Sequence, residues 1–477
     1  MKSLINIANC GGYAKFHIIG IGGIGMSGLA EILFNLGYYV QGSDIASNDN
    51  TERLQKIGIK IFIGHNATNI LQANYVVIST IIKENNVEYQ EAVSRKIPII
   101  RRAEMLAEIM RMKTCISISG SHGKTSTTSI VASVFEAAGL SPTVINGGII
   151  HSKSTNAYIG EGEYMIVEAD EADATFIKIP SSIAVVTNID PEHMDFYKNF
   201  DNLYTAFKNF IKNLPFYGFG VICADHPVTK KLISDIIERK VITYGIKSED
   251  SNVCASNIRM SHDKSIFDIH INFPHNNIHY MIKDASLAIP GEHNILNCLA
   301  AVAIAAELDF GVRTIKDGLM AFTGVKRRFT KTGEYQNNII IDDYAHHPEE
   351  IKATLATAKI ALKNKSGNVL AIFQPHKYSR LTNLFMEFTE AFDNCDYLFI
   401  SPVYTAGETQ IEDYDHIKLT DSLKAKYPDK HIASFSDSSE LENIIRTHAS
   451  GNDIIIFMGA GNITNWANAM PKILNKN

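Results

Sequence analysis

The stretch Ile-Ser-Ile-Ser-Gly-Ser-His-Gly-Lys-Thr-Ser-Thr-Thr, residues 116–128, determines how the rest of the chain is interpreted. An apolar, strand-like run enters a glycine-rich turn, and a helix is predicted over residues 130–138. Backbone N–H groups at the start of a helix favour an anion in such a turn. Lys124 can reach the β- and γ-phosphates of a nucleotide, and the Thr125 hydroxyl can ligate the Mg²⁺ that bridges them. The residues predicted to surround the phosphates are Gly120, Ser121, His122, Gly123, Lys124, Thr125 and Ser126.

This turn is a short variant of the phosphate-binding loop. The full eight-residue pattern requires a glycine at position 118, where this chain has Ile118. An ordinary glycine-rich turn between a strand and a helix is the structural alternative. A Gly-Lys-Thr sequence at that junction favours the phosphate site.

Length and composition limit the possible classes of protein. A chain of 477 residues is too long for one core and suggests about three domains. The formal charge of −6 disfavours a general nucleic-acid surface. The six cysteines are scattered, which favours reduced thiols over a zinc or redox site. Neither a signal peptide nor a membrane-spanning stretch is evident, so we expect a cytoplasmic protein with no membrane partner.

Residues 1–112 have the pattern of a Rossmann-type domain. A strand over residues 16–19 is followed by Gly20-Ile21-Gly22-Gly23-Ile24-Gly25 and by a helix over residues 26–36. A second strand ends at Asp44, about twenty residues beyond the glycines. Gly20, Gly22, Gly23 and Gly25 would let the backbone approach a diphosphate. The pattern alone does not distinguish NAD from another nucleotide, and a purely structural turn is a further alternative.

Two more strand ends in this segment offer polar side chains. His65 follows a predicted strand over residues 59–63, and Ser79 follows one over residues 75–78. Ligands of open α/β sheets lie at the carboxyl ends of strands, so both residues are candidates for the same nucleotide. A solvated loop histidine is the alternative for His65. Arg101 and Arg102 are equally well explained as a surface pair.

Residues 113–322 offer ligands for a hard cation beside the phosphate loop. Glu168 follows a predicted strand over residues 164–167, and His193 comes after one over residues 183–188. Mg²⁺ prefers oxygen ligands and tolerates an imidazole. We predict Thr125, Glu168 and His193 as metal ligands. Solvated strand ends are the alternative.

A predicted helix over residues 298–308 begins close to three further candidates for nucleotide binding. His293, Asn294 and Asn297 could hydrogen-bond a base, or the amides could only cap the helix. The basic run Lys326-Arg327-Arg328 follows near the end of the segment. We predict that Arg328 reaches phosphate charge, whereas a solvated basic face is the usual alternative.

Residues 323–477 resemble a second Rossmann-like domain. Four predicted strands, over residues 339–341, 369–373, 397–400 and 454–457, each end in a polar cluster. Tyr344 and His346 follow the first strand, and Lys377 and Arg380 follow the second. The two cations suit a carboxylate or a phosphate.

In their order, these motifs resemble the Mur ligase family of ATP-dependent amide-forming enzymes. The resemblance spans nearly the whole chain. Departures from the family pattern are Ser121, Ala345 and Lys377, and a lysine at 377 offers a point charge where arginine would offer a planar fork. The motifs that carry the resemblance are Gly20–Gly28, Gly120–Thr125, Glu168–Glu171, Glu292–Asn294, Lys326–Phe329, Asp342–Pro348 and Gln374–Arg380.

The resemblance implies an α/β protein of three domains. These are a Rossmann-like domain for a UDP-sugar (residues 1–112), a central phosphate-loop ATPase-type domain (113–322), and a Rossmann-like domain for an amino acid (323–477). The glycine-rich turn, with Asp44, His65 and Ser79, would then hold UDP in place of NAD. Tyr344, His346, Lys377 and Arg380 would bind the amino acid.

The resemblance also implies a reaction in which UDP-N-acetylmuramate, L-alanine and ATP give an amide, ADP and phosphate in peptidoglycan precursor synthesis. Lys124, His193 and Arg328 would act on the phosphoryl group, with Mg²⁺ as cofactor, and His346 would position the amine. His193 or solvent could instead be the base. Alternatives are a family member that joins a murein tripeptide to the same sugar nucleotide, and an NAD-dependent dehydrogenase. A monomer and a homodimer are both compatible with the sequence.

Overall fold

The computed structural model describes residues 14–111, 113–153, 155–261, 263–362, 366–411 and 414–476. Cys10 therefore lies outside the described residues. The chain divides into two compact units, which are described separately. The first comprises residues 1–255, 269–282 and 296–322, and the second comprises residues 256–268, 283–295 and 323–477.

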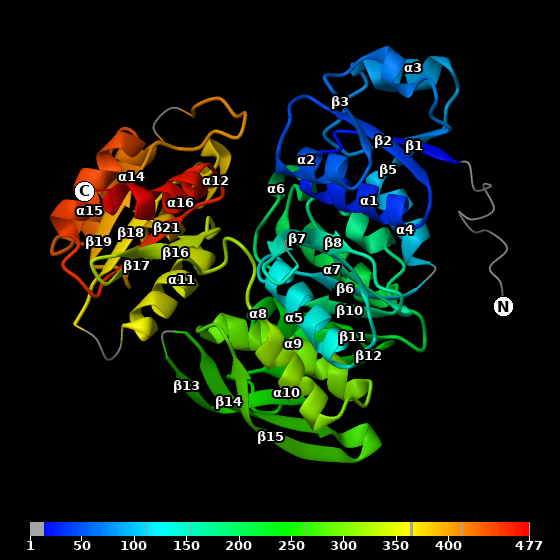
Figure 1. Cartoon of the computed structure of the whole chain (residues 1–477). Helices are drawn as coiled ribbons and strands as arrows, with labels where there is room; N and C mark the ends of the chain where they lie inside the picture. The colour runs from blue at the N-terminus through cyan, green and yellow to red at the C-terminus, as the bar shows by residue number, and fades with distance from the viewer. Residues whose placement is uncertain are drawn as a thin grey trace. The chain divides into compact units, whose positions relative to one another are not determined.

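The first unit opens with a five-stranded sheet of order β3-β2-β1-β4-β5, in which all neighbouring strands are parallel (Figure 1). Its strands are β1 (Lys15–Ile19), β2 (Tyr39–Asp44), β3 (Lys60–Ile63), β4 (Tyr75–Ile78) and β5 (Ile99–Arg101). The accompanying helices are α1 (Ile24–Asn35), α2 (Asp49–Lys56), η2 (Ala67–Ile70), α3 (Val87–Ser94) and α4 (Arg102–Met110). The Rossmann-like order predicted from the glycine pattern is confirmed.

The central sheet has ten strands in the order β15-β14-β13-β12-β11-β10-β6-β9-β7-β8. Strands β6, β9, β7, β10, β11 and β12 pair in parallel, whereas β8 runs antiparallel to its neighbour β7. The strands are β6 (Thr114–Ser119), β7 (Thr143–Ile150), β8 (Thr155–Tyr158), β9 (Tyr164–Glu168), β10 (Ile183–Val186), β11 (Phe219–Cys223), β12 (Lys240–Gly245), β13 (Val253–Met260), β14 (Ser265–Phe273) and β15 (Ile278–Leu287).

Helix α5 (Lys124–Ala137) begins directly after the phosphate loop, six residues earlier than predicted. Hydroxyl side chains usually weaken a helix by competing for its backbone. Here Thr128 Oγ1 donates to Lys124 O at 2.8 Å and Ser129 Oγ donates to Thr125 O at 2.9 Å, so both bond within the helix. The other helices of this part are η3 (Thr175–Lys178), α6 (Met194–Tyr197), α7 (Phe200–Lys212), α8 (Pro227–Asp235), η4 (Pro274–Asn276), α9 (Glu292–Glu307) and α10 (Val312–Ala321).

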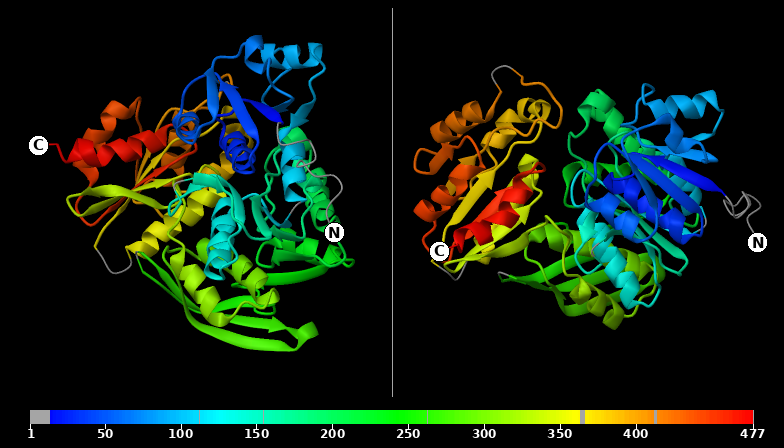
Figure 2. Two further views of the ribbon diagram at one scale, coloured as in Figure 1. Left: turned by 45° about the vertical axis from the view of Figure 1, so that its right-hand side comes forward. Right: turned by 45° about the horizontal axis from the view of Figure 1, so that its top comes forward.

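The second unit contains a six-stranded sheet of order β16-β17-β21-β18-β19-β20, with helices on both faces (Figures 1 and 2). Its strands are β16 (Thr330–Tyr335), β17 (Asn338–Asp343), β18 (Val369–Phe373), β19 (Tyr397–Ile400), β20 (His431–Ser434) and β21 (Ile454–Met458). Its helices are α11 (Pro348–Ala361), α12 (Tyr378–Asn383), α13 (Phe385–Thr389), α14 (His416–Lys426), η5 (Ser438–Glu440), α15 (Leu441–His448) and α16 (Ile463–Leu474).

Alternating residues of β21 explain why its sequence is apolar throughout. Ile454 and Ile456 pack with residues of α11 and α14, whereas Ile455 and Phe457 pack with residues of α15 and α16. Parallel strands covered on both faces lose the polar alternation of a half-exposed strand. The four predicted strands are confirmed, and the carboxyl ends of β17, β21 and β18 lie side by side.

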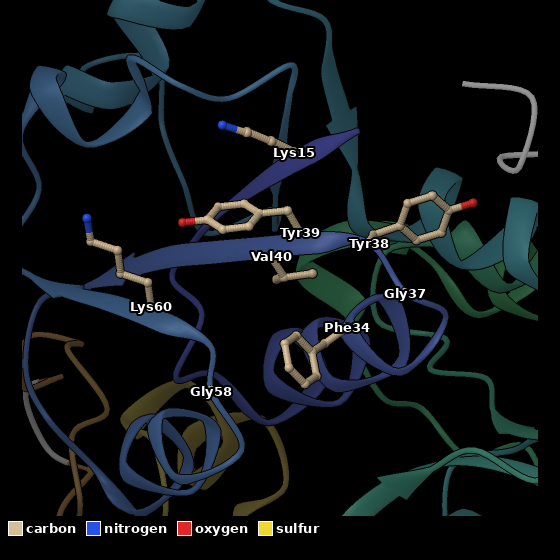
Figure 3. A pocket seen from close by; sticks show the side chains of 8 residues that line it. All are labelled: Lys15, Phe34, Gly37, Tyr38, Tyr39, Val40, Gly58 and Lys60. Atoms are coloured by element: carbon tan, nitrogen blue, oxygen red, sulfur yellow. The ribbon is translucent and has the colours of Figure 1, made fainter. Parts of the chain in front are cut away.

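A hollow of about 360 Å³ lies at the amino ends of β1, β2 and β3, opposite the glycine-rich turn (Figure 3). Its polar side chains include Lys15 and Lys60, and Tyr39 lies between them in the view shown. Substrates of open α/β sheets bind at the carboxyl ends of strands, so this hollow is not our candidate substrate site.

Among the described residues, no helix is both long and apolar enough to span a membrane.

Candidate active site

The phosphate loop connects the buried strand β6 to helix α5. Gly123 is the N-cap of α5 and has φ +83°, a left-handed conformation that favours glycine. A Cβ at Gly123 would lie 2.5 Å from Asn297 Oδ1, so the side chain of Asn297 on α9 lies against the loop. The structure thus brings together two segments that the sequence separates by more than 170 residues.

Lys124 points back into its own loop. Its Nζ donates to Gly120 O at 2.6 Å and to Ser121 O at 3.1 Å, and lies 2.8 Å from a carboxylate oxygen of Glu171. Burial opposes the charge of Lys124, but nearby carboxylates, Glu171 foremost, outweigh burial and raise the pKa of Lys124. The ammonium is therefore a cation held at the centre of the loop.

Glu171 is a buried carboxylate that the sequence-based site did not include. Its side chain is 1% exposed, and burial raises its pKa to about 7 although the neighbouring Lys124 opposes that shift. Glu171 belongs to the quoted motif Glu168-Ala169-Asp170-Glu171, and its place three residues after the strand end was the available signal. It occupies the side of Lys124 where a phosphate would be expected.

One group of oxygen and nitrogen ligands near the loop could hold a metal ion. Ligand atoms of Asp170, Glu171 and His193 fall within 4.8 Å of one another, which is a spacing that suits a hard cation. Glu168 is outside this group but acts on the charge of Lys124, and its Oε2 accepts a hydrogen bond from Gly147 N at 2.7 Å. Of the three predicted ligands, His193 lies in this cluster. The roles of Thr125, Glu168 and His193 stay predictions.

Residues that follow the carboxyl end of β10 form hydrogen bonds with the phosphate loop. Thr187 Oγ1 donates to His122 O at 2.6 Å, and His122 N donates to Asn188 Oδ1 at 2.7 Å. His122 Nε2 lies 3.1 Å from Asp190 Oδ2, and His226 Nε2 lies 3.2 Å from Asp190 Oδ1. Burial raises the pKa of Asp190, but hydrogen bonds from these two histidines outweigh it and lower the pKa. Asp190 N also donates to Ser121 Oγ at 2.8 Å, so Asp190 contacts two residues of the phosphate loop, Ser121 and His122.

The glycine-rich turn of the first sheet is closed by Asp44. Gly22 N donates to Asp44 Oδ2 at 2.8 Å, and both Gly20 N and Ile21 N donate to Ser43 O. Gly23 is the N-cap of α1. Asp44 thus has a structural role in the turn, and its predicted contact with a nucleotide stays a prediction. The same applies to Gly20, Gly22, Gly23 and Gly25.

Arg102 is a residue at this turn that sequence reasoning left as a possible surface residue. The space where a side chain at Gly25 would lie is filled by the guanidinium of Arg102, which begins α4. A cation at the N-terminus of α1 would complement a bound diphosphate.

His65 lies at the end of β3 with its Nδ1 3.1 Å from Ser43 Oγ, and Ser79 is half-buried after β4.

The polar clusters of the second unit converge at one edge of its sheet. His346 and His376 have ring centroids 6.0 Å apart, and the rings of Tyr344 and His346 are 5.1 Å apart. Arg380 Nη1 donates to His376 O at 3.4 Å and lies 3.3 Å from His376 Nδ1. Burial lowers the pKa of His376 to about 4, and Arg380 acts in the same direction. His376 was quoted in a motif but was not predicted as a site residue.

Two further cations flank this cluster. The guanidinium of Arg327 lies 4.5 Å from the ring centroid of Tyr344, and that of Arg328 lies 5.2 Å from it. Arg327 Nη2 donates to Gly459 O at 2.9 Å, whereas Arg328 Nη1 lies 3.6 Å from Glu350 Oε1. Lys377 is the N-cap of α12 and has φ +71°. The cluster can offer positive charge to a carboxylate.

The remaining nucleotide candidates, His293 and Asn294, lie in the first turn of α9. Asn294 Nδ2 donates to Pro290 O at 2.7 Å, which is the capping alternative considered from sequence. Burial lowers the pKa of His293 to about 4, so its ring is neutral at physiological pH. Whether either side chain contacts a base stays a prediction.

Comparisons with known proteins match three consecutive stretches of the chain to one family. Residues 15–114 match the Mur ligase family catalytic domain, residues 118–305 the Mur ligase middle domain, and residues 327–461 the Mur ligase glutamate ligase domain. The UDP-N-acetylmuramate–L-alanine ligase of Rickettsia bellii is 57% identical over 459 residues, covering 96% of this chain and 95% of that protein. The enzyme of the same name from Rickettsia felis is 57% identical over 457 residues, covering 95% of each chain.

Solved structures extend the likeness to the fold. The crystal structure of a UDP-N-acetylmuramate–alanine ligase from Thermotoga maritima has a TM-score of 0.80 and 29% identity, covering 97% of this chain and 99% of that one. A murein peptide ligase from Psychrobacter arcticus has a TM-score of 0.69 at 20% identity, covering 97% and 99% respectively, and supports the fold alone. The predicted three-domain α/β class is confirmed.

Proposed function

The chain belongs to the Mur ligase family, and we propose that it joins L-alanine to UDP-N-acetylmuramate with consumption of ATP. The observation that carries this proposal is the identity of 57% over 96% of the chain to a ligase of that name. The intact Gly-Lys-Thr sequence at the phosphate loop supports ATP use. An NAD-dependent dehydrogenase would leave this loop unexplained, and family membership removes that alternative.

The chemistry explains why ATP is required. A carboxylate is a poor acceptor for an amine at neutral pH because its oxygen is a poor leaving group. Transfer of the γ-phosphoryl group of ATP to the carboxylate of UDP-N-acetylmuramate gives an acyl phosphate and ADP. The neutral amine of L-alanine then attacks the acyl carbon, and phosphate leaves. The amide forms and the amine loses a proton.

Residues of the phosphate loop would bind and orient ATP. Lys124 lies within hydrogen-bonding distance of two loop carbonyls and of Glu171, so its ammonium is already held where phosphate oxygens would approach. Exchange of Glu171 for a phosphate would keep the charge of Lys124 paired. The N-terminus of α5 adds backbone N–H donors.

The residues near this loop fit a divalent cation. Mg²⁺ would supply positive charge against the phosphate oxygens of ATP. Thr125, Glu168 and His193 are our proposed ligands. Asp170 and Glu171 add carboxylate oxygens within reach of His193, which is the donor set that a hard cation requires.

The other substrates would be held by the two Rossmann-like sheets. We assign the UDP part of the sugar nucleotide to the glycine-rich turn, His65 and Ser79. We assign the carboxylate of L-alanine to Arg380 and Lys377, and the positioning of its amine to His346. Support comes from the clustering of His346, His376 and Arg380 at one sheet edge. Because ATP and a UDP-sugar are its proposed substrates, we propose that the reaction takes place in the cytoplasm.

Phosphate release measured with ATP and UDP-N-acetylmuramate tests the proposal. L-alanine, glycine, L-serine and the murein tripeptide should be added separately. Turnover led by L-alanine would support the assignment. Preference for the tripeptide would instead identify a ligase that recycles murein peptides, and no turnover with any of them would refute a ligase acting on this sugar nucleotide.

A further inference from the structure

Glu88 on α3 is a fully buried carboxylate at the carboxyl edge of the first sheet. It is 0% exposed, and its oxygens accept hydrogen bonds from Ser43 Oγ at 2.5 Å and from Asn69 Nδ2 at 2.6 Å. His65 Nδ1 lies 3.0 Å from Glu88 Oε2, and His17 Nε2 lies 3.5 Å from the same oxygen. The proposed mechanism does not use this group.

The carboxylate is ionised over the whole physiological range. Burial raises the pKa of Glu88, but the adjacent His17 and the hydrogen bonds from Ser43 and Asn69 outweigh burial and bring the pKa to about 2. An ionised carboxylate only accepts hydrogen bonds. His65 must therefore direct an Nδ1–H group toward Glu88.

The tautomer of His17, the second imidazole beside Glu88, can be assigned from its neighbours as well. Gln41 Nε2 lies 3.3 Å from His17 Nδ1 and donates to Asn69 O at 2.7 Å. An amide nitrogen is a donor, so His17 Nδ1 accepts and its hydrogen is on Nε2, which faces Glu88. Both imidazoles thus have a fixed tautomer, and Glu88 determines the tautomer of His65.

Of the two imidazoles in this network, His65 is the one that reaches solvent. Its side chain is 17% exposed, and within the described part of the chain no hydrogen-bond partner exists for its Nε2. Ser43, which bonds Glu88 through Oγ, also accepts from Gly20 N and Ile21 N through its carbonyl. The network is therefore built onto the glycine-rich turn that we assign to UDP.

We propose that Glu88 is a positioning residue that holds His65 with Nε2 directed at the uridine diphosphate portion of the substrate. The inference rests on the proposed function, since it names a further contact of the same substrate. Glu88 itself stays beneath the site and touches no ligand. Burying the Glu88 carboxylate costs free energy because the charge loses its hydration. An apolar side chain could pack at this position, but it could not orient a substrate-binding imidazole.

A double-mutant cycle tests this inference. Glu88→Gln keeps the size of the side chain and removes the charge that fixes His65, and His65→Gln removes the ring. Each variant should weaken binding of UDP and of UDP-N-acetylmuramate by about tenfold, which is about 1.4 kcal/mol. The double variant should bind no more weakly than His65→Gln alone, because Glu88 acts through His65. The KM for ATP should stay unchanged.

Two controls separate positioning from a general loss of structure. Glu31→Gln breaks an ion pair with Arg53 in the same part of the chain and should leave UDP binding unchanged. Nitrogen NMR shifts should show His65 protonated at Nδ1 in the parent protein and a mixture of tautomers in Glu88→Gln. A merely structural role for Glu88 would lower thermal stability without changing the tautomer of His65.

Several outcomes would overturn the inference. Parent-like UDP binding by His65→Gln would do so even if Glu88→Gln did not fold. Additive losses in the double variant would show that Glu88 acts independently of His65. If the parent protein binds neither UDP nor UDP-N-acetylmuramate, the proposed function fails first, and this result is distinct from normal parent binding with unaffected variants.

Discussion

Gly120→Ala should damage the phosphate loop far more than an ordinary glycine substitution. Gly120 has φ +134°, a conformation that side chains rarely adopt. A Cβ there would collide with the Thr187 hydroxyl and would lie 3.0 Å from Thr187 N and 3.1 Å from Asn188 N. Those backbone atoms belong to the end of a central strand and cannot move away easily.

The magnitude follows from two additive effects. Holding alanine in this backbone conformation costs about 1–3 kcal/mol, and the collision adds about 1–3 kcal/mol. A total of about 2–6 kcal/mol should lower the midpoint of thermal unfolding by about 4–24 °C, since each kcal/mol is worth about 2–4 °C in a domain of this size. Displacing the Thr187 hydroxyl also breaks its 2.6 Å bond to His122 O, so ATP affinity should fall at least about tenfold.

Gly139→Ala is the matched control for this prediction. Gly139 lies just beyond the other end of α5 with φ +73°, and a Cβ there would meet no atom within 4 Å. Gly139→Ala should therefore lower the free energy of unfolding only by the cost of holding alanine in that backbone conformation, about 1–2 kcal/mol. Its ATP binding should be normal. Thermal unfolding and ATP titration of both variants are the measurements. Equal stability of the two variants together with normal ATP affinity in Gly120→Ala would refute the reasoning.

Three further outcomes can be measured with the same protein. Lys124→Ala should abolish product formation while UDP-N-acetylmuramate binding, measured by calorimetry, survives; loss of both in a folded protein would contradict separate sites. Arg380→Ala should raise the KM for L-alanine at least about tenfold, as expected for loss of a charge-assisted contact, and equal effects on the KM for ATP would remove Arg380 from the amino-acid site. The neutral form of His376 is favoured on folding because its pKa is lowered to about 4. The contribution of neutral His376 to the free energy of unfolding is therefore complete above pH 6.5 and is lost as pH falls from about 6.5 to 4. For a partly exposed ring the loss is roughly 2 kcal/mol. The denaturant midpoint of His376→Gln should therefore decline less over that range than the midpoint of the parent protein.

The sequence predicted most strands because the sheets are covered on both faces. Continuous apolar runs such as Val369–Phe373 are confirmed at the same bounds. The helix after the phosphate loop was predicted too short, since Thr and Ser residues at 125–129 have low intrinsic helix preference. Burial of that face and the bonds of Thr128 and Ser129 back to the helix carbonyls overcame this preference.

The sequence allowed candidate site residues to be proposed within one motif, but it did not predict contacts between motifs. The Gly-Lys-Thr sequence indicated Lys124 and Thr125 as candidates because a glycine-rich turn before a helix start favours an anion. That Glu171 pairs with Lys124, and that Glu168 instead bonds Gly147, depends on how β6, β9 and β7 lie side by side. No spacing along the chain encodes these distances.

The sequence by itself determined the fold class and the order of the motifs and led to the prediction of a phosphate site at the loop, because these depend on local patterns of glycine, charge and hydrophobicity. Only the tertiary structure decided which side chains meet: Arg102 with Gly25, Asn297 with Gly123, and Glu88 with His17 and His65. Each of these contacts joins residues far apart in the chain. Strand order and burial set them, and a buried carboxylate has a role only once its partners are in place.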